Sequence, residues 1–367
     1  MSAVIIDCGS GYTKMGFAGA EVPAHVIPTV MNHQSSLCEG FFPLLTSNQK
    51  SANVLIGNDA LKVLSNTSPI EQGRISDWTN YELFLRNCYS QFLKIDPSDR
   101  PCILTEPPLN ASKSHAKLRE VMFETFGVPS LYIGVQAVLA LYTYWDGRGA
   151  VTGTVVDAGD GVTHVIPVTD GYVTGTYEMP VGGQDVTNYI AATFVARTKI
   201  SPSDSLTRLA KQVKEKLAYV SLDLAAEHAL YEKDPLMFQR IQWTDPSMGE
   251  TSTLEIGRER FLASEVFFSA NTNSLPCLLY NAVQAAPIDC RKGLLSNIVL
   301  SGGSTLLPNF AQRLENEVTS LANGRVVKVL QNMDKQRYAV WHGASVLAQT
   351  AGFDQALCTR SEYFEGG

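Results

Sequence analysis

Short apolar runs alternate along this chain with stretches whose apolar residues recur every three or four positions. Runs of the first kind predict buried strands and stretches of the second kind predict amphipathic helices. The predicted strands are Val4–Ile6, Met15–Ala18, Ile103–Thr105, Leu131–Val135, Val155–Val156, Val162–Val168, Tyr172–Tyr177 and Ile298–Leu300. The predicted helices are Ile75–Leu93, Ser114–Phe126, Gln136–Tyr144, a helix opened by Gly182–Asp185, Leu206–Leu217, Pro308–Leu321 and a final helix at Tyr338–Ala348. This alternation of strand and helix indicates open α/β sheets.

Local polar signals place the boundaries of several elements. Ser76 and Asp77 are candidate caps for the first helix, and Gly127 ends the second. Two polar stretches have little periodicity. Met31–Lys50 is expected to be an exposed loop on a small inserted subdomain that closes near Asn66, and Asp223–Glu255 a peripheral subdomain.

One short pattern occurs twice, once in each half of the chain. It reads D-C-G-S-G-Y-T-K at Asp7–Lys14 and D-A-G-D-G-V-T-H at Asp157–His164, 150 positions later. Each copy follows a predicted strand, and the two glycines are expected to tolerate positive φ in a tight hairpin turn. Successive N–H groups of such a turn form a concavity that binds anions. Two copies with matching flanks predict two related lobes that close on one polyanion, which we interpret as a phosphate chain.

The aspartate at the start of each turn is a candidate for holding a cation. Magnesium prefers one or two carboxylates together with water and phosphate oxygens, so Asp7 and Asp157 suit a hydrated Mg²⁺. The alternative is that each carboxylate only bonds its own turn backbone. Lys14 would supply positive charge beside the phosphates, or would be an ordinary solvated strand lysine.

Further polar residues could orient a water or a nucleoside. Gln136 stands where a strand becomes a helix and His164 at the exit of the second turn, and together they could hold a water in line with a phosphorus atom. Each has a structural alternative, a buried amide or a satisfied core histidine. Gly302 and Gly303 could let the main chain approach a base or sugar, or could form a plain strand-to-helix turn. Lys214 and Glu215 lie off the apolar stripe of their helix and could be a solvated face.

Composition limits the possible classes of protein. At 367 residues the chain is long enough for two lobes, and its 45% hydrophobic and 18% charged residues are typical of a globular protein. A net charge of −7 argues against a nucleic-acid partner bound through general electrostatics.

Cysteines and apolar segments add expectations about the protein's environment. Seven cysteines without a C-x-x-C pair predict reduced thiols in a cytosolic or nuclear protein. No signal peptide is visible at the N-terminus. The longest apolar stretch, around Tyr132–Trp145, contains Gln136 and is too short to span a bilayer, so no membrane insertion is expected.

Taken together, these motifs resemble the actin superfamily nearly from end to end. Asp7–Lys14 is similar to its first phosphate loop, Asp157–His164 to its second and Ser301–Leu306 to its adenosine loop. Within the superfamily the likeness is to the actin-related proteins of the branching complex. The segments that carry it are Leu104–Asn110, Leu131–Leu141, Thr152–Gly171, Arg258–Phe268 and Gln336–Trp341.

The resemblance implies an actin-like (ribonuclease H-like duplicated) α/β fold, with two lobes of mixed sheet and helices around a nucleotide cleft. The outer lobe would comprise residues 1–142 and 337–367, with a small subdomain inserted at about 30–68. The inner lobe would comprise residues 143–336, with a subdomain inserted at about 183–270. These boundaries are expectations from the resemblance.

The resemblance also implies ATP or ADP with Mg²⁺ or Ca²⁺ in the cleft. Asp7 and Asp157 would hold the ion through water, and Gln136 with His164 would position the hydrolytic water of a slow ATPase. The residues implied at the phosphates are Ser10, Gly11, Tyr12, Lys14, Gly159, Asp160, Gly161 and Val162. Those implied around adenosine are Lys214, Glu215, Gly302, Gly303, Ser304, Leu306 and Arg337.

The implied role is in the complex that nucleates branched actin filaments, in the cytoplasmic actin cytoskeleton. Its partners would be actin-related protein 2, the other branching-complex subunits and actin. The alternatives are an actin-related protein of another assembly, chromatin-remodelling or dynactin-like, and a sugar-kinase-like phosphotransferase. A kinase needs a carboxylate base where this chain has Gln136 and His164.

The sequence departs from the family pattern at three places. Ala158 stands where the family usually has a serine that reaches phosphate, and Gln184 where it usually has arginine. Only four residues follow Tyr363, whereas the family continues into a longer tail.

Overall fold

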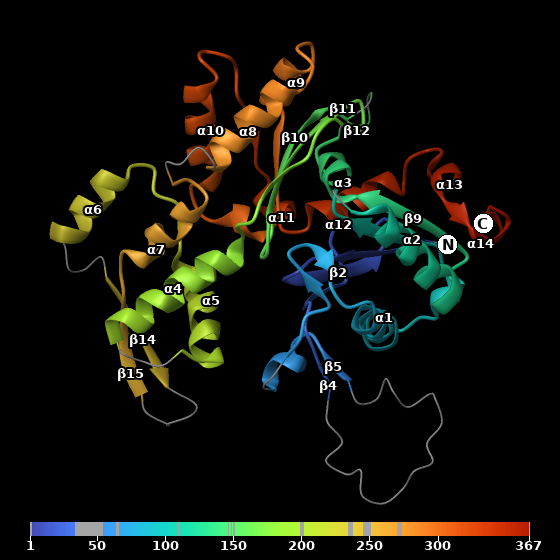
Figure 1. Ribbon diagram of the computed structural model, residues 1–367, viewed down its shortest axis with the longest axis horizontal. Helices are drawn as coiled ribbons and strands as arrows, with labels where there is room; N and C mark the ends of the chain where they lie inside the picture. Colours follow the sequence, from blue (N-terminus) through green and yellow to red (C-terminus); the bar gives the residue numbers. More distant parts are fainter. Residues whose placement is uncertain are drawn as a thin grey trace, which may run out of the picture. The chain divides into compact units, whose positions relative to one another are not determined.

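A computed structural model describes residues 2–33, 54–63, 66–108, 110–145, 147, 149, 151–198, 202–233, 238–244, 251–269 and 274–366. The chain forms two compact units, each with its own sheet and core (Figure 1). Unit 1 comprises Met1–Val151, Asp170–Val173 and Tyr338–Gly367, and unit 2 comprises Thr152–Thr169 and Thr174–Arg337. The predicted lobe and subdomain boundaries stay a prediction.

Unit 1 is built on a six-stranded mixed sheet in the order β18-β9-β8-β1-β2-β3. The strands of this sheet are β1 Val4–Cys8, β2 Tyr12–Phe17, β3 His25–Pro28, β8 Cys102–Glu106, β9 Ser130–Val135 and β18 Cys358–Thr359. The other strands of the unit, which lie outside this sheet, are β4 Met31–His33, β5 Val54–Ile56, β6 Ile70–Glu71, β7 Arg74–Ile75 and β12 Tyr172–Val173. Its helices are α1 Trp78–Asn87, α2 Ser112–Glu120, α3 Gln136–Tyr142, α12 Ala339–Leu347, α13 Phe353–Ala356 and α14 Arg360–Glu365. Short 3₁₀ or π-helical turns are η1 Ala60–Lys62, η2 Cys88–Leu93, η3 Pro97–Asp99 and η4 Val121–Thr125.

The core of unit 1 lies on one face of this sheet. Ile6, Met15, Phe84, Phe123 and Leu131, from both strands and helices, are buried together there. Such aliphatic and aromatic burial is the main stabilising contribution to the unit.

Two helices of unit 1, α3 and α12, approach each other very closely. A Cβ atom at Gly343 would lie 1.7 Å from the carbonyl oxygen of Leu139, so only glycine permits this contact. On α12 the indole nitrogen of Trp341, which is fully buried, donates to the carbonyl oxygen of Ile5 at 3.2 Å. The helix is therefore fastened both to α3 and to the first strand.

Unit 2 repeats the scheme with a sheet that runs β11-β10-β16-β17, with β13 paired to β11. Its strands are β10 Gly153–Ala158, β11 Thr163–Thr169, β13 Tyr177–Met179, β14 Gln239–Thr244, β15 Thr251–Ile256, β16 Ile298–Ser301 and β17 Val329–Leu330. Its helices are α4 Gly183–Thr198, α5 Asp204–Leu217, α6 Leu224–Lys233, α7 Glu259–Leu262, α8 Leu275–Ala285, α9 Arg291–Ser296, α10 Phe310–Leu321 and α11 Met333–Gln336, with 3₁₀ turns η6 Ala263–Val266 and η7 Gly303–Leu306.

The core of unit 2 gathers Val156, Val165, Phe194, Leu279 and Phe310 from its sheet and helices. The predicted apolar stripe of α5 belongs to it, since Leu206, Leu209, Ala210 and Val213 are buried. Leu217 at the end of the stripe is half-buried.

The duplication inferred from the sequence appears in the register of the two sheets. In unit 1, β1 pairs antiparallel with β2 and parallel with β8. In unit 2, β10 pairs antiparallel with β11 and parallel with β16. Asp7 lies opposite Lys14, and Asp157 lies opposite His164, so equivalent residues occupy equivalent ladder positions.

Most predicted elements are present, with shifted ends. The first helix begins at Trp78, capped by the Asp77 side chain, which accepts from the backbone N–H of Asn80. Ile75, predicted as its start, is instead the last residue of β7. Gly127 ends the second helical segment with a φ of +66°.

Two expectations about secondary structure are wrong. Tyr338–Ala348 is not the final helix, because α13, β18 and α14 follow it, and Thr359 and Glu362 form a capping box that starts α14. The peripheral subdomain expected at Asp223–Glu255 stays a prediction, and this stretch contains α6 and the β14–β15 hairpin, whose alternating residues bury Trp243 and Leu254. Met31–His33 is the strand β4 rather than loop, while residues 34–50 of that predicted loop lie outside the described residues.

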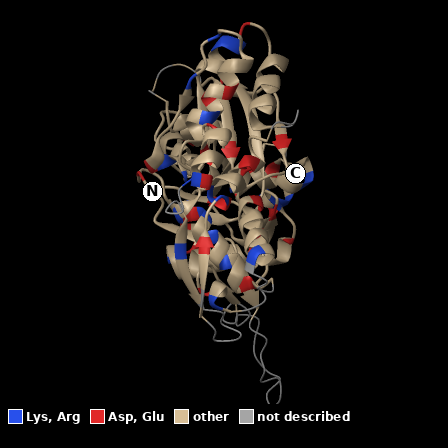
Figure 2. Ribbon diagram, turned by 90° about the vertical axis from the view of Figure 1, so that its left-hand side faces the viewer, with Lys and Arg blue, Asp and Glu red and all other residues tan. Residues whose placement is uncertain are grey.

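The distribution of charge, the state of the cysteines and the character of the helices can be compared with the expectations from composition. Lys, Arg, Asp and Glu are interspersed in the view of Figure 2. The six described cysteines, at positions 8, 88, 102, 277, 290 and 358, are free thiols. None of the described helices has the length and apolar character needed to cross a bilayer.

Candidate functional site

The first turn joins β1 to β2 and is closed by a hydrogen bond from the Gly9 N–H to the Tyr12 carbonyl oxygen, at 3.2 Å. Neighbouring backbone fixes its position in unit 1. The Thr29 N–H donates to the Gly11 carbonyl oxygen at 3.1 Å, and the Gly73 N–H donates to the Ser10 hydroxyl at 2.7 Å. Ser10, Gly11 and Tyr12 are half-buried in this turn, as a recessed ligand-binding loop requires.

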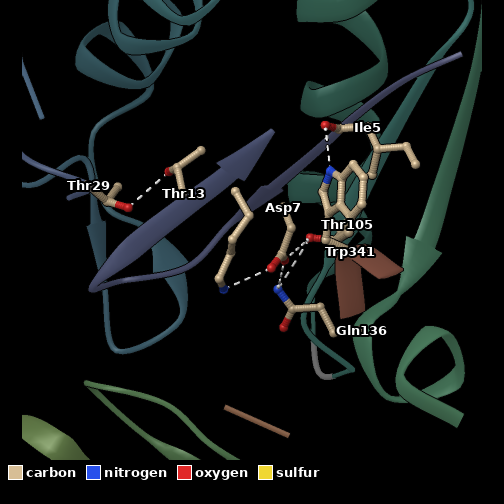
Figure 3. A network of polar contacts seen from close by, with 8 residues as sticks. Ile5, Asp7, Thr13, Thr29, Thr105, Gln136 and Trp341 are labelled. Atoms are coloured by element: carbon tan, nitrogen blue, oxygen red, sulfur yellow. Dashed lines mark hydrogen bonds and ion pairs between the residues drawn. The ribbon is translucent and has the colours of Figure 1, made fainter. Parts of the chain in front are cut away.

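Asp7 is the centre of a polar network at the end of β1 (Figure 3). Its side chain is 2% exposed, and Lys14 donates to Oδ2 at 2.9 Å. Thr105, at the end of the parallel strand β8, donates to Oδ1 at 2.6 Å. The Gln136 amide nitrogen lies 3.4 Å from both Asp7 Oδ1 and Thr105 Oγ1. Asp7 thus bonds to side chains of three other elements rather than only to its own turn.

The second turn has the same geometry in unit 2. The Gly159 N–H donates to the Val162 carbonyl oxygen at 3.0 Å, which matches the Gly9–Tyr12 bond of the first turn. Asp157, Asp160 and Gly161 are half-buried, and Val162 is buried. The same sequence pattern therefore folds into the same hairpin in both units.

Backbone carbonyl groups of the second turn are tied to the start of α4 and to the η7 turn. The Gly159 oxygen accepts from the Gly183 N–H at 2.9 Å and from the Ser304 hydroxyl at 2.7 Å. The Asp160 oxygen accepts from the Gln184 N–H at 2.8 Å. These bonds preorganise the turn, and Gln184 takes part through its backbone while its side chain is exposed and bonds to Asn188.

The glycines of the two turns do not adopt the positive φ that their pattern suggested. Gly9, Gly11, Gly159 and Gly161 have no positive φ, so the prediction that the turns need this freedom is wrong. At Gly9 and Gly159 a Cβ atom would instead lie 3.2 Å and 3.4 Å from the carbonyl oxygen that closes the turn. At Gly9 the tightness of the turn, not left-handed backbone, favours glycine, whereas the distance at Gly159 is that of an ordinary van der Waals contact.

Gly302 is the glycine of this site that requires positive φ. Its φ is +89°, and an added Cβ would lie 2.3 Å from the carbonyl oxygen of Ala158. The end of β16 thereby runs against the end of β10, immediately before the second turn. Gly303 beside it has no atom within 4 Å of the Cβ position, so that side of the loop is open.

Lys214 of α5 reaches the second turn. Its Nζ donates to the Gly183 carbonyl oxygen at 2.8 Å and to Asp160 Oδ1 at 3.3 Å. Burial lowers the pKa of Lys214, and Asp160 opposes that shift. Its neighbour Glu215 is exposed, so the helix presents the lysine to the turn and the glutamate to solvent.

The remaining predicted nucleoside residues lie around η7 and α11 in unit 2. Leu306 is half-buried, while Gly303 and Arg337 are exposed. The Gly302 N–H donates to the Gln336 carbonyl oxygen at 3.3 Å, which links η7 to the residue before Arg337. The structure thus brings Gly302, Gly303, Ser304 and Lys214 to the second turn, and Glu215 lies at an exposed position next to Lys214 on α5.

His164 is buried in β11, with 5% of its surface exposed. Its Nε2 lies 3.6 Å from a carboxylate oxygen of Glu178 on β13. Sequence reasoning did not identify Glu178, because nothing local shows that β13 pairs with β11. Thr105 was also missed, although a threonine that ends a predicted strand next to β1 was a usable signal.

Within each unit, the chemistry of these residues suits a phosphate-bearing ligand and a divalent ion. Each unit has a tight hairpin turn with a lysine beside it, Lys14 at the first turn and Lys214 at the second, and the Cβ position of Gly303 has open space next to the second turn. No cluster of three or more metal-binding side chains occurs among the described residues. Both oxygens of Asp7 already accept hydrogen bonds, so its contact with an ion would pass through water.

Comparison with known proteins agrees with this architecture. The actin family profile matches residues 1–212 and 204–367. Actin-related protein 3 of Dictyostelium discoideum is 39% identical over 400 residues, which cover 100% of this chain and 95% of that protein. Actin-related protein 3 of Acanthamoeba castellanii is 38% identical, with the same coverage. The Saccharomyces cerevisiae protein of that name is 36% identical and covered to 96%.

The predicted resemblance is confirmed, and the actin-like α/β fold class with it. Duplicated hairpin turns, matching registers and full-length similarity agree with each other. The chain therefore belongs to the actin family, and within that family it is similar along its whole length to actin-related protein 3.

Proposed function

We propose that this chain is an actin-related subunit of the complex that nucleates branched actin filaments. The observation that carries the proposal is similarity over the entire chain to actin-related protein 3 from several eukaryotes. In this role the chain pairs with actin-related protein 2 and, with the other subunits, imitates a filament end from which actin grows. Its place is the cytoplasmic actin cytoskeleton.

The test is isolation of the tagged full-length chain from its native extract, with mass spectrometry of the proteins that accompany it. We expect an actin-related protein 2 homologue and further branching-complex subunits in constant proportion. Recovery with chromatin-remodelling or dynactin-type subunits instead would overturn the assignment.

Members of the actin family bind a nucleotide with a divalent cation. For this chain we propose ATP or ADP with Mg²⁺ or Ca²⁺. Ser10, Gly11 and Tyr12 of the first turn and Gly159, Asp160, Gly161 and Val162 of the second would bind phosphates. Lys214, Glu215, Gly302, Gly303, Ser304, Leu306 and Arg337 would surround adenosine.

The charged residues have distinct roles in this proposal. Lys14 would neutralise phosphate charge while it holds Asp7, and Asp7 and Asp157 would bind water of the hydrated ion. A bound divalent ion supplies charge stabilisation of the phosphates. Because Lys214 is held by Gly183 and Asp160, it would add positive charge beside the second turn at little cost in side-chain ordering.

Hydrolysis at this site requires that the attacking water is held in a fixed orientation. The Gln136 amide nitrogen points to Asp7 and Thr105, so its carbonyl oxygen remains as the acceptor for a water (Figure 3). His164 is proposed as the second water-positioning group. The amide of Gln136 cannot accept a proton, and neither residue is the carboxylate base that a kinase aims at a substrate hydroxyl, so the expected reaction is slow hydrolysis in service of assembly.

Replacing Gln136 with alanine tests this role. The affinity of the variant for Mg·ATP should stay within about twofold of the parent's. Its rate of hydrolysis should fall by about tenfold or more, because only the transition state loses a contact. Gln312→Ala, at an exposed α10 glutamine that bonds to Asn316, is the control. Hydrolysis at the parental rate would make Gln136 structural, and rapid ATP consumption on adding a sugar would favour a phosphotransferase.

A further inference from the structure

A row of polar side chains crosses four neighbouring strands of unit 2. Asp157 of β10 lies beside Ser301 of β16 and opposite His164 of β11, and His164 in turn lies opposite Glu178 of β13. Residues directly opposite one another in a sheet project from the same face. The row therefore places two carboxylates on either side of one imidazole.

This row lies on the face of the sheet opposite the hydrophobic cluster that contains Val156 and Val165. The flanking positions Val156 and Val165 are paired with each other and belong to the core of unit 2. Because strand side chains alternate between faces, Asp157 and His164 project from the other side. That face carries the proposed ion and water-positioning residues.

His164 is largely screened from bulk solvent, so each ring nitrogen needs a partner in the protein or in a bound water. Glu178 supplies one, with an oxygen 3.6 Å from Nε2 and a side chain that is 31% exposed. The distance is longer than a hydrogen bond, so the contact is an attraction between the carboxylate and the ring. A carboxylate at this place favours the tautomer that carries its proton on Nε2, which leaves Nδ1 as an acceptor.

We infer that Glu178 is a positioning residue for His164: it fixes the orientation and tautomer of the imidazole, so that Nδ1 can accept a hydrogen bond from a water. This inference rests on the proposed nucleotide function and names a residue that the sequence motifs do not contain. The residue matched to His164 in the first turn is Lys14, which meets Asp7 directly. In the second turn no such ion pair joins Asp157 to His164 among the described residues, and Glu178, from a third strand, lies beside the His164 ring instead.

An ordinary surface ion pair would have little consequence, since solvent screens the attraction between exposed charges. Glu178 differs because its partner is a buried ring that is proposed to contact the reacting water. Loss of the Glu178 carboxylate should change the tautomer and orientation of the His164 ring and lower the rate of hydrolysis. The affinity for ATP should stay nearly unchanged.

The test uses the full-length chain labelled with ¹⁵N-histidine, with the His164 signals identified by their loss in His164→Gln. In the parent we expect the Nε2–H tautomer to dominate, and in Glu178→Ala a mixture of the two tautomers. Single-turnover hydrolysis should fall about three- to tenfold in Glu178→Ala, with ATP affinity within about twofold. Glu178→Gln keeps an acceptor oxygen and should recover most of the rate.

Glu255→Gln is the matched control, because Glu255 is an exposed strand glutamate of the same unit that pairs with Arg240 at 2.9 Å. It should leave both the ring signals and the rate unchanged. Unchanged His164 signals in Glu178→Ala, or hydrolysis at the parental rate, would overturn the inference while normal ATP binding leaves the nucleotide function standing. A parent chain that binds no Mg·ATP would instead show that the proposed function itself is wrong.

Discussion

At the residue scale, the two copies of the turn motif have the same backbone but different partners. Asp7 meets the cation of Lys14 at 2.9 Å and is held by Thr105 at 2.6 Å. Asp157 stands opposite His164, which faces Glu178. The first aspartate is thus paired with a cation of its own unit, whereas no ion pair of Asp157 occurs among the described residues.

That difference predicts the effect of removing the second carboxylate. Asp157→Ala should weaken binding of Mg·ATP about tenfold or more, and of ion-free ATP by less than about threefold, because only the hydrated ion loses a contact. The measurement is ATP affinity by titration calorimetry with and without Mg²⁺. Asp289→Ala, at an exposed position outside the turns, is the control. Equal affinity with and without Mg²⁺ in the parent would refute the two-carboxylate assignment.

A buried thiol at the start of β8, beside Val4, gives a pH prediction. Burial raises the pKa of Cys102 from its ordinary value of 9.0 to about 12, and the Tyr89 hydroxyl donates to its Sγ at 3.3 Å. The folded state therefore keeps a proton that the unfolded state loses above pH 9. By linkage this contribution to stability is fully present below pH 9 and is lost as pH rises through about 12.

Cys102→Ser can still accept from Tyr89 but does not titrate in this range. Between pH 9 and 11 the unfolding free energy of the parent should fall more steeply than that of Cys102→Ser, by about 1.4 kcal/mol per pH unit at most. Urea unfolding at several pH values measures both slopes. Parallel curves would mean that the Cys102 thiol ionises alike in both states.

At the element scale, the site depends on backbones that approach each other without intervening side chains. The end of β16 passes the end of β10 at Gly302, as α12 passes α3 at Gly343. Because glycine has no Cβ atom, it allows two backbones to approach more closely than any other residue would. The second turn, η7 and the start of α4 form one rigid group for this reason.

A pair of adjacent glycines tests this dependence. Gly302→Ala should destabilise the chain by about 3 kcal/mol or more, because its φ of +89° and the 2.3 Å approach to the Ala158 oxygen both exclude a methyl group. Gly303→Ala has open space and should change the unfolding free energy by less than about 1 kcal/mol. Urea unfolding of both variants decides the point, and equal stability would show that β16 can shift away from β10.

At the scale of the whole molecule, actin-family subunits associate head to tail, and an open filament forms when both ends of one chain complement each other. We expect Tyr338–Ala348, which contains the helix α12, at one end of the molecule and the Met31–Lys50 loop at the other. Residues 34–50 of that loop lie outside the described residues. The tail after α12 lies on unit 1, where β18 pairs with β9 and Tyr363 stacks on Phe123 at 4.7 Å.

We predict that the purified chain does not build filaments by itself. After sedimentation in Mg·ATP and polymerising salt it should stay in the supernatant, while conventional actin pellets as the control. A subunit that templates growth in one direction needs only one actin-like end. Long homofilaments would contradict the proposed role in the branching complex.

The sequence alone determined the duplication, the fold family and the two turns, because these depend on local patterns. Apolar runs set the strands, the repeat of aspartate and glycine set the hairpins, and Gln136 was placed correctly where a strand becomes a helix. Each of these is a short-range property of consecutive residues.

Only the tertiary structure decided which distant side chains meet. Thr105 holds Asp7 because β8 is the parallel neighbour of β1, and Glu178 faces His164 because β13 pairs with β11. Glycine is needed at position 302 because the backbone there lies against the carbonyl oxygen of Ala158, 144 positions earlier in the chain. Strand order and helix packing create these contacts, and residues so far apart in sequence leave no local pattern that predicts them.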